Sequence, residues 1–523
     1  MEVKNMGMRL IKKGKKGLLS IIFSRFWIMA ILIILQFVVL FASIFWFSDY
    51  RQHYDILKNA FVAIMVLYLL NHNMNSTAKI TWLVIVMLFP VFGSLLFWFT
   101  QLELGHRMEK ARLDYLISTT KTSIQQDKEI IQKLSEESPE TEALVHYLAR
   151  SGCFPIYDQT DVSYFSTGED KFEVLLNQLE QAKSFIFLEY FIVEEGIMWG
   201  QVLEILARKA AEGVEVRVMY DGTCESSLLP YDYPKRLATL GIKCKMFAPV
   251  TPFLSTHYNY RDHRKIVVID GQVAFTGGVN LADEYINQKL RFGHWKDTAI
   301  MLKGEAVKSF TLMFLQMWNV EEKTPEFYKY INASALPVKE AKGYVIPYGD
   351  CPLDDDKVGE RVYMDILNRA NKYVHIMTPY LILDGEMETA LRFAAKRGVD
   401  VKIILPGIPD KKSAYALAKS HYKNLLEAGV KIYEYTPGFV HAKVFTSDDC
   451  KAVVGTINLD YRSLYHHYEC AAYMYKTDCI VDIEKDFKET LAKCTRVTKE
   501  TVKKEKLGWK VAGWVLKVVA PLM

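Results

Sequence analysis

The motif HxK(x)4D occurs twice in this chain, and the two copies lie at a fixed distance from each other. The copies are His263, Lys265 and Asp270, then His441, Lys443 and Asp448. Each residue of the first copy lies 178 positions before its counterpart, and the same offset separates Asn280 from Asn458. Sequence features that repeat at a constant spacing predict a duplicated structural unit. The sequence therefore predicts two related domains, each carrying one copy of the motif.

The segments before each motif alternate between strand and helix patterns in the same order. In the first repeat, a helix pattern at 172–179 precedes strand patterns at 184–193, 213–221 and 240–247. The second repeat has corresponding strand patterns at 372–383, 398–406 and 428–435. Strands that alternate with helices are typical of α/β domains. We therefore expect two pseudo-symmetric α/β domains that share a single active site.

The chain divides into five predicted parts, in keeping with a length of 523 residues. The charged, helix-patterned stretch at 106–135 predicts a connector, and Pro139 is expected to mark its end. The parts are an N-terminal membrane anchor at 1–100, a helical connector at 101–145, a first domain at 146–335, a second domain at 336–497 and an amphipathic tail at 498–523.

Two apolar segments near the N-terminus predict transmembrane helices. Residues 26–47 are long enough to cross a hydrocarbon layer of about 30 Å, and residues 80–99 form a second span with Pro90 and Gly93 inside. The shorter apolar stretch at 60–70 has three interpretations: a third span, a re-entrant segment, or a helix packed against the other two. Basic residues precede the first span and follow the second, which favours two crossings of the cell membrane and a cytoplasmic catalytic part. Three crossings would reverse that orientation.

The two motifs carry residue types that suit phosphodiester chemistry. Residues two apart on a strand point to the same face, so His263 and Lys265 are expected to project together, as are His441 and Lys443. One histidine can attack phosphorus, and the other can move the proton of the alcohol. The lysines can neutralise the developing charge. Further candidates for phosphate binding follow each motif, namely Gly278 and Asn280, then Gly455 and Asn458.

Two acids are candidates to orient the motif histidines, because an imidazole needs a partner that sets its tautomer. They are Asp297, in the HWKD segment, and Glu469. Ordinary solvated carboxylates are the alternative for both. Three other histidines, His257, His466 and His467, are interpreted as surface or packing residues. We expect no metal ligands and no cofactor, because the two lysines carry the positive charge that the reaction needs.

Composition narrows the class of substrate. The net charge of +4 is small for this length and does not favour a nucleic-acid binder. Half of the residues are apolar, which exceeds the usual need of a globular core. The eight cysteines are scattered, with no CxxC pair, and are expected to be free thiols in a reducing compartment.

Several segments resemble the phospholipase D superfamily, and specifically the bacterial cardiolipin synthases. The resemblance covers nearly the whole chain and rests on residues 82–93, 187–192, 259–271, 275–286, 293–298, 378–383, 438–445 and 455–463, and on Glu469. It implies two phospholipase D-like domains and transfer of a phosphatidyl group between two phosphatidylglycerols, which gives cardiolipin and glycerol. It also implies a phosphohistidine on His263, with His441 as the general acid and base.

The sequence departs from the pattern of this family around the motifs. Asp262 and His467 stand where the family commonly has Asn, and Tyr468 replaces a Phe. These departures leave the acceptor alcohol open. The alternatives are a hydrolase that uses water, a transferase with another alcohol, a nuclease, and a membrane scaffold without catalytic activity. The partners that the resemblance implies are phosphatidylglycerol and membrane lipids, and the oligomeric state does not follow from the sequence.

Overall fold

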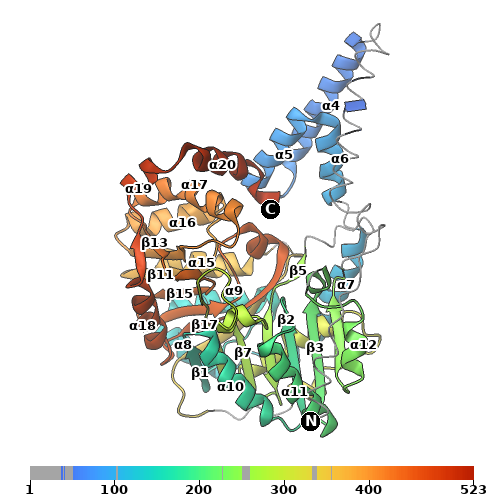
Figure 1. Cartoon of the computed structure of the whole chain (residues 1–523), viewed down its shortest axis with the longest axis vertical. Helices are drawn as coiled ribbons and strands as arrows, with labels where there is room; N and C mark the ends of the chain where they lie inside the picture. The colour runs from blue at the N-terminus through green and yellow to red at the C-terminus, as the bar shows by residue number, and fades with distance from the viewer. Residues whose placement is uncertain are drawn as a thin grey trace.

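The computed structural model describes residues 34, 37, 38, 41, 51–101, 104–226, 228–249, 260–332, 338–354 and 356–522. Most of the predicted first span at 26–47 therefore lies outside the described residues, as does His257. Figure 1 shows two mixed α/β halves side by side, with a group of N-terminal helices projecting from one end of the body. All eight cysteines are free.

The N-terminal helices differ from the predicted spans. Helix α4 (Arg51–Asn71) contains the apolar stretch 60–70, and the predicted span at 80–99 is broken into α5 (Ser76–Leu88) and α6 (Pro90–Gln101). The break falls at Phe89, whose φ of −132° and ψ of 76° are not helical. Proline disfavours a helical conformation in the residue before it, which explains the break. The prediction of one continuous helix over this stretch was wrong.

Within the described ranges, no helix combines the length and the apolar character that crossing a bilayer requires. The three N-terminal helices nevertheless expose many large apolar side chains. These include Ile56, Leu57, Phe61, Ile64, Leu67, Leu70, Ile80, Met87, Leu88, Leu95 and Trp98. A small cluster of buried residues, including Trp82 and Phe97, holds the helices together.

The connecting helices are part of the packed body. They are α7 (Leu104–Thr120), α8 (Lys128–Glu137) and α9 (Pro139–Gly152). Pro139 begins α9 at its first turn and does not end the helical stretch, contrary to the prediction. This position suits proline, because the first N–H groups of a helix have no partner within the helix. Leu116, Leu134 and Leu148 are fully buried, so these helices add to the cores of both halves.

The first half is built on a sheet whose strand order, in the residues described, is β1-β9-β7-β6-β2-β3-β4. The parallel strands β2, β3 and β4 match the three predicted strand segments, and β6 pairs antiparallel to β2. The strands are β1 (Thr160–Phe165), β2 (Phe185–Tyr190), β3 (Glu215–Asp221), β4 (Lys243–Phe247), β6 (Lys265–Ile269), β7 (Val273–Gly277) and β9 (Ala299–Gly304). The helices are α10 (Gly168–Glu180), α11 (Ile197–Ala211), α12 (Tyr233–Ala238), α13 (Val307–Trp318) and α14 (Tyr328–Ile331).

The second half repeats this arrangement. Its main strand order, within the same described ranges, is β10-β17-β16-β15-β11-β12-β13-β18, with β11, β12 and β13 parallel and β15 antiparallel to β11. The strands are β10 (Tyr344–Asp350), β11 (Tyr373–Met377), β12 (Asp400–Pro406), β13 (Lys431–Tyr435), β15 (Val444–Ser447), β16 (Lys451–Gly455), β17 (His467–Tyr475) and β18 (Cys494–Arg496). The helices are α15 (Val358–Arg369), α16 (Gly385–Lys396), α17 (Lys412–Ala428) and α18 (Ile480–Leu491).

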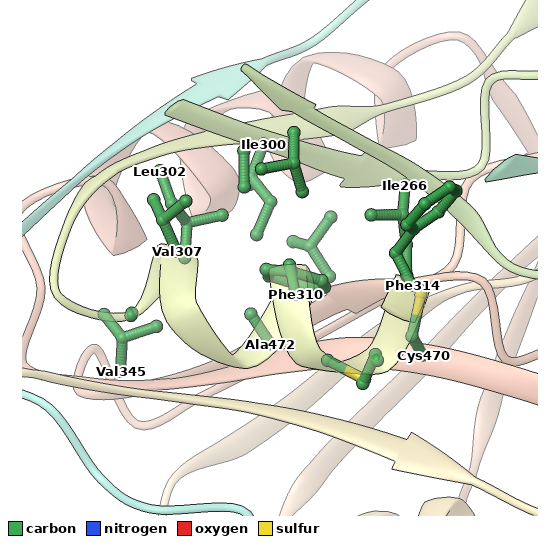
Figure 2. Close-up of a cluster of buried hydrophobic side chains, with 14 of the residues drawn as sticks. Ile266, Ile300, Leu302, Val307, Phe310, Phe314, Val345, Cys470 and Ala472 are labelled. Carbon is green, nitrogen blue, oxygen red and sulfur yellow. The ribbon is translucent and has the colours of Figure 1, made fainter. Parts of the chain in front are cut away.

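Helix α13 joins the two halves through a common core. Figure 2 shows Val307, Phe310 and Phe314 of this helix between side chains of both sheets. Ile266, Ile300 and Leu302 come from the first sheet, and Val345, Cys470 and Ala472 come from the second. All of these side chains are buried. Burial of apolar surface contributes about 25 cal/mol per Å², so this interface fixes the relative position of the halves.

Two short parallel pairings also cross between the halves. Strand β5 (Arg261–Asp262) pairs with the start of β17, and β8 (His294–Lys296) pairs with β14 (Gly438–Val440). Each pairing lies directly before one of the motif histidines. The chain ends with α19 (Lys499–Lys504) and α20 (Leu507–Val519), and α20 packs on α17. Thr81 of α5 donates a hydrogen bond to the Val518 carbonyl, at 2.6 Å, so the last helix contacts the N-terminal helices.

Candidate active site

The first motif histidine lies at the junction between β5 and β6. Its backbone N–H donates to the Tyr468 carbonyl across the interface between the halves, at 2.9 Å. Its ring Nδ1 lies 2.9 and 3.0 Å from the two carboxylate oxygens of Glu469. Both side chains are buried. An acid from the second repeat therefore orients His263 of the first.

The second motif histidine has the same arrangement with the repeats exchanged. The backbone N–H of His441 donates to the Lys296 carbonyl at 2.7 Å. Its Nδ1 lies 2.6 Å from Oδ2 of Asp297, a fully buried carboxylate of the first repeat. Each histidine thus follows a strand that pairs with the segment before its acid. The two interface pairings fix both histidine–acid pairs at once.

The burial of the site disfavours positive charge on both histidines. Burial lowers the pKa of His441 to about 4, and the nearby Lys443 contributes to this shift. Burial also lowers the pKa of His263 well below its ordinary value, although Glu469 opposes the change. Burial alone would raise the pKa of Glu469, but His263 and His467 outweigh it and hold that pKa well below its usual range. Without lipid in the site, burial therefore favours the neutral imidazoles, and a neutral His263 can attack phosphorus.

The two motif lysines lie next to their histidines and share one electrostatic environment. The Lys265 ammonium group donates to the His263 carbonyl at 2.5 Å, and Lys443 donates to the His441 carbonyl. Burial lowers the pKa of Lys265 to about 8 and that of Lys443 to about 7. Each lysine also feels the charges of both Asp297 and Glu469. These influences across the interface place the two motifs in one cluster.

The motif aspartates lie at the opposite ends of their strands. Strand β6 separates Asp270 from Lys265 by about 16 Å, at 3.3 Å per residue. The Asp270 carboxylate accepts the backbone N–H groups of residues 183–185, at 2.7–2.8 Å. Asp448 accepts those of residues 371–373 in the same way, at 2.7–2.9 Å. Both aspartates anchor the start of a neighbouring strand, and the structure does not bring them to the histidines.

The asparagines and glycines after each motif differ in their surroundings. Asn280 accepts from the Ile192 N–H at 3.1 Å and donates to the Tyr285 hydroxyl at 2.7 Å. The buried Oδ1 of Asn458 has no hydrogen-bond partner among the described residues, so this amide is the freer of the two.

The two glycines make room for protein atoms. A Cβ at Gly278 would lie 2.0 Å from the Asp297 carboxylate, and one at Gly455 would lie 2.4 Å from Ala471. Contact with these protein atoms is sufficient to require glycine at both positions.

Three further residues line the site. The Phe191 ring packs edge-on to His263, with 4.9 Å between ring centroids, and Tyr285 packs edge-on to His441, at 5.4 Å. His467 is buried, with its ring centroid 5.3 Å from that of His263. Sequence reasoning treated His467 and His466 as surface or packing residues. Two signals placed His467 near the site: the acid Glu469 lies two positions later, and His467 stands where the family commonly has Asn.

One group of side chains could bind a cation, although the sequence predicts no metal ligands. In the described part of the chain, His263, His467 and Glu469 are the one group with the spacing of a cation site. His466 points elsewhere, because its Nε2 faces the Pro521 carbonyl at 3.4 Å.

Comparisons with known proteins show which family the chain resembles. A family model described as "Cardiolipin synthase, PLD-like domain" matches residues 175–318 and 363–491, and one described as "Phospholipase_D-nuclease N-terminal" matches residues 60–100. An uncharacterized protein of Streptococcus mutans is 60% identical over 458 residues, which cover 88% of this chain and 99% of that protein. Cardiolipin synthase 2 of Bacillus cereus is 34% identical over 479 residues, which cover 89% of this chain and 90% of that enzyme.

A solved structure shares the fold. Phosphatidylserine synthase of Haemophilus influenzae superposes with a TM-score of 0.56 at 15% identity, over 73% of this chain and 98% of that enzyme. The family match extends over both repeats, and the similarity to the B. cereus enzyme extends over most of the chain. The chain therefore belongs to the cardiolipin synthase family of phospholipase D-like proteins.

Proposed function

We propose that this protein transfers a phosphatidyl group from one phosphatidylglycerol to another, which gives cardiolipin and glycerol. One observation carries the proposal beyond family membership. Two buried histidines from different repeats each hold Nδ1 against a carboxylate of the opposite repeat, with a motif lysine beside each. Such a pair can divide a transfer reaction between a nucleophile and a proton carrier.

In the first step, Nε2 of His263 attacks the phosphorus of the donor lipid. The P–O bond to the glycerol headgroup breaks. His441, which takes up a second proton when the anionic lipid binds beside Asp297, gives the proton on its Nε2 to that leaving oxygen. The phosphohistidine carries positive charge on its ring, and the Glu469 carboxylate beside Nδ1 stabilises that charge. Lys265 and Lys443 face the non-bridging oxygens. The free amide oxygen of Asn458 accepts a hydrogen bond from a hydroxyl group of the lipid.

In the second step, His441 is neutral and removes the proton from a hydroxyl of a second phosphatidylglycerol. That oxygen attacks phosphorus, the P–N bond to His263 breaks, and cardiolipin leaves. Asp297 holds the proton-bearing Nδ1 of His441 in both steps, so that Nε2 faces the reacting oxygen. This order of roles follows the family resemblance, because the two histidine–acid pairs are otherwise closely alike.

The proposed reaction requires both repeats. Each histidine is oriented by an acid of the other repeat, so neither predicted domain, 146–335 or 336–497, holds a complete site. We expect separately expressed halves to be inactive.

We also propose that the protein is held at the cell membrane, with its catalytic part facing the cytoplasm. The many exposed apolar side chains of α4, α5 and α6 support this attachment, since gathered exposed apolar side chains mark protein or membrane contact sites. Helix α20, whose C-terminal end contacts α5, adds exposed Leu507, Trp514 and Val515. The basic residues around the predicted anchor support the orientation. Protease treatment of intact spheroplasts tests it, because a C-terminal tag should survive until the membrane is permeabilised.

The decisive experiment supplies purified protein with phosphatidylglycerol and identifies both products. Cardiolipin together with free glycerol is expected, and phosphatidic acid without cardiolipin would instead assign a hydrolase. The variants His263→Ala and Lys443→Ala should both lose turnover. A matched control is His375→Ala, since His375 is a buried histidine on a carboxylate, Glu484, outside the site.

The proposed order of the histidines has its own test. Donor lipid carrying a radioactive phosphorus label is mixed with enzyme, and the reaction is quenched by denaturation within milliseconds. Peptide mapping should locate an acid-labile phosphoryl adduct on His263. An adduct found on His441 alone would reverse the assigned roles.

A further inference from the structure

A third histidine lies in the site and has no part in the proposed reaction. His467 is 7% exposed, and neither of its ring nitrogens has a hydrogen-bond partner among the described residues. Its Nδ1 lies 3.6 Å from Oε1 of Glu469, which is beyond hydrogen-bond distance. A buried polar group without a partner is unfavourable, because it has given up its hydrogen bonds to water. This cost needs an explanation in the site itself.

The surroundings of His467 match the geometry of a cation site. One ligand atom each from His263, His467 and Glu469 lies within 4.8 Å of the other two. Ligand atoms at about 2.0–2.1 Å from a tetrahedral zinc ion are separated by about 3.3 Å. The distances from Oε1 of Glu469 to Nδ1 of His263 and to Nδ1 of His467 are 2.9 and 3.6 Å, which lie on either side of that value.

We propose that His263, His467 and Glu469 form a binding site for a zinc-class divalent cation, whose occupation blocks phosphatidyl transfer. Two imidazoles and one carboxylate favour Zn²⁺ over Mg²⁺ or Ca²⁺, which prefer oxygen ligands. The three protein ligands leave a fourth position for water or an oxygen of a phosphate group. The blocking effect rests on the proposed function, whereas binding of the cation does not.

The cation takes the place of the proton between His263 and Glu469. That proton leaves to solvent. The Glu469 carboxylate then neutralises the charge of the metal ion and is no longer available to stabilise the positive charge of the phosphohistidine. A cation on His263 also withdraws electron density from the imidazole that attacks phosphorus. Lys265 and Lys443 repel the ion, so the affinity is lower than that of a structural zinc site. Any route that admits a phosphodiester to His263 also admits a small cation.

The test uses the full-length protein in detergent, freed of metal with a chelator and of any polyhistidine tag. Calorimetric titration with Zn²⁺ should show one site per chain. Titration with Co²⁺ should produce the visible absorption of a tetrahedral ion. His467→Asn should weaken Zn²⁺ binding more than about 100-fold. This loss is larger than the one expected when the removed residue only holds a metal ligand in place. His466→Asn is the matched control and should bind as the wild type does, because His466 faces the Pro521 carbonyl.

Activity is then measured with and without Zn²⁺, and each variant is compared with its own metal-free rate. Zn²⁺ should inhibit the wild type and His466→Asn, and His467→Asn should resist it. Equal binding by the wild type and His467→Asn, or no binding by the wild type, would overturn the site. If the protein binds Zn²⁺ as described but makes no cardiolipin, the proposed function fails and the cation site stands. Inhibition that persists in His467→Asn would show that zinc acts elsewhere.

Discussion

The substitution Glu469→Gln tests whether a charge from the second repeat drives chemistry on a histidine of the first. Glutamine keeps the size and shape of the side chain and removes its charge. In the protein, both carboxylate oxygens lie within 3.0 Å of Nδ1 of His263, and the Thr456 hydroxyl donates to one of them. The amide oxygen of the substituted side chain can still accept from the imidazole. The variant therefore isolates the contribution of the negative charge.

The size of the effect follows from the burial of this pair. Glu469 is fully buried, so solvent does not screen its interaction with His263. A hydrogen bond to a charged group contributes about 1.5–3 kcal/mol, and this one strengthens as His263 gains positive charge in the transition state. Because about 1.4 kcal/mol corresponds to a tenfold change in rate, kcat should fall about 10- to 150-fold. KM should change little, since the carboxylate does not touch the lipid.

The assay is steady-state formation of cardiolipin from phosphatidylglycerol in mixed micelles. Glu484→Gln provides the control, because Glu484 holds His375 through contacts of 3.0 and 3.1 Å in an equally buried setting outside the site. Both variants should lose similar thermal stability, and only Glu469→Gln should lose kcat selectively. Equal kcat in the two variants would refute the argument that Glu469 supports charge on His263.

Three further predictions address the other parts of the site. Gly278→Ala should lower activity at least tenfold and the free energy of unfolding by about 1–3 kcal/mol, because its Cβ would collide with the Asp297 carboxylate. The control Gly200→Ala should lower neither activity nor stability, because nothing lies within 4 Å of an added Cβ there. Asp448→Ala should lower the free energy of unfolding by about 2–4 kcal/mol in denaturant titrations, because three backbone amides lose their acceptor, while folded enzyme keeps its kcat. The value of kcat/KM should fall as pH rises above about 7, because the pKa of Lys443 is lowered to about 7 and a neutral lysine no longer attracts the anionic diester. A pH profile that stays flat to about pH 10 would contradict the role of Lys443 in binding the lipid phosphate.

Much of the fold could be predicted because the repeats carry local patterns. Apolar strand segments at 184–193 and 372–383 became β2 and β11, and the helix pattern at 172–179 became α10. The break within the predicted span at 80–99 was also visible, since Pro90 stands inside it. Length and hydropathy alone predict one helix over that stretch. The backbone preference of the residue before proline decided otherwise.

The roles of the motif residues separate the two kinds of information. The sequence by itself determined that His263 and His441 are equivalent, because a constant offset is a property of the chain alone. It also indicated Asp297 and Glu469 as acids that orient the motif histidines, but not which histidine each acid reaches. Only the tertiary structure shows that Asp297 reaches His441, while Asp270 anchors the start of a strand.

The exchange of acids between repeats was decided only by the tertiary structure. Glu469 follows His441 in the chain, yet it holds His263, and Asp297 of the first repeat holds His441. The reason is the packing of both sheets around α13 and the two short strand pairings that cross between the halves. Those contacts join residues that lie far apart in the chain, and no local pattern records them. The sequence determined which chemistry the chain carries, and the packing of its halves decided which residues meet to perform it.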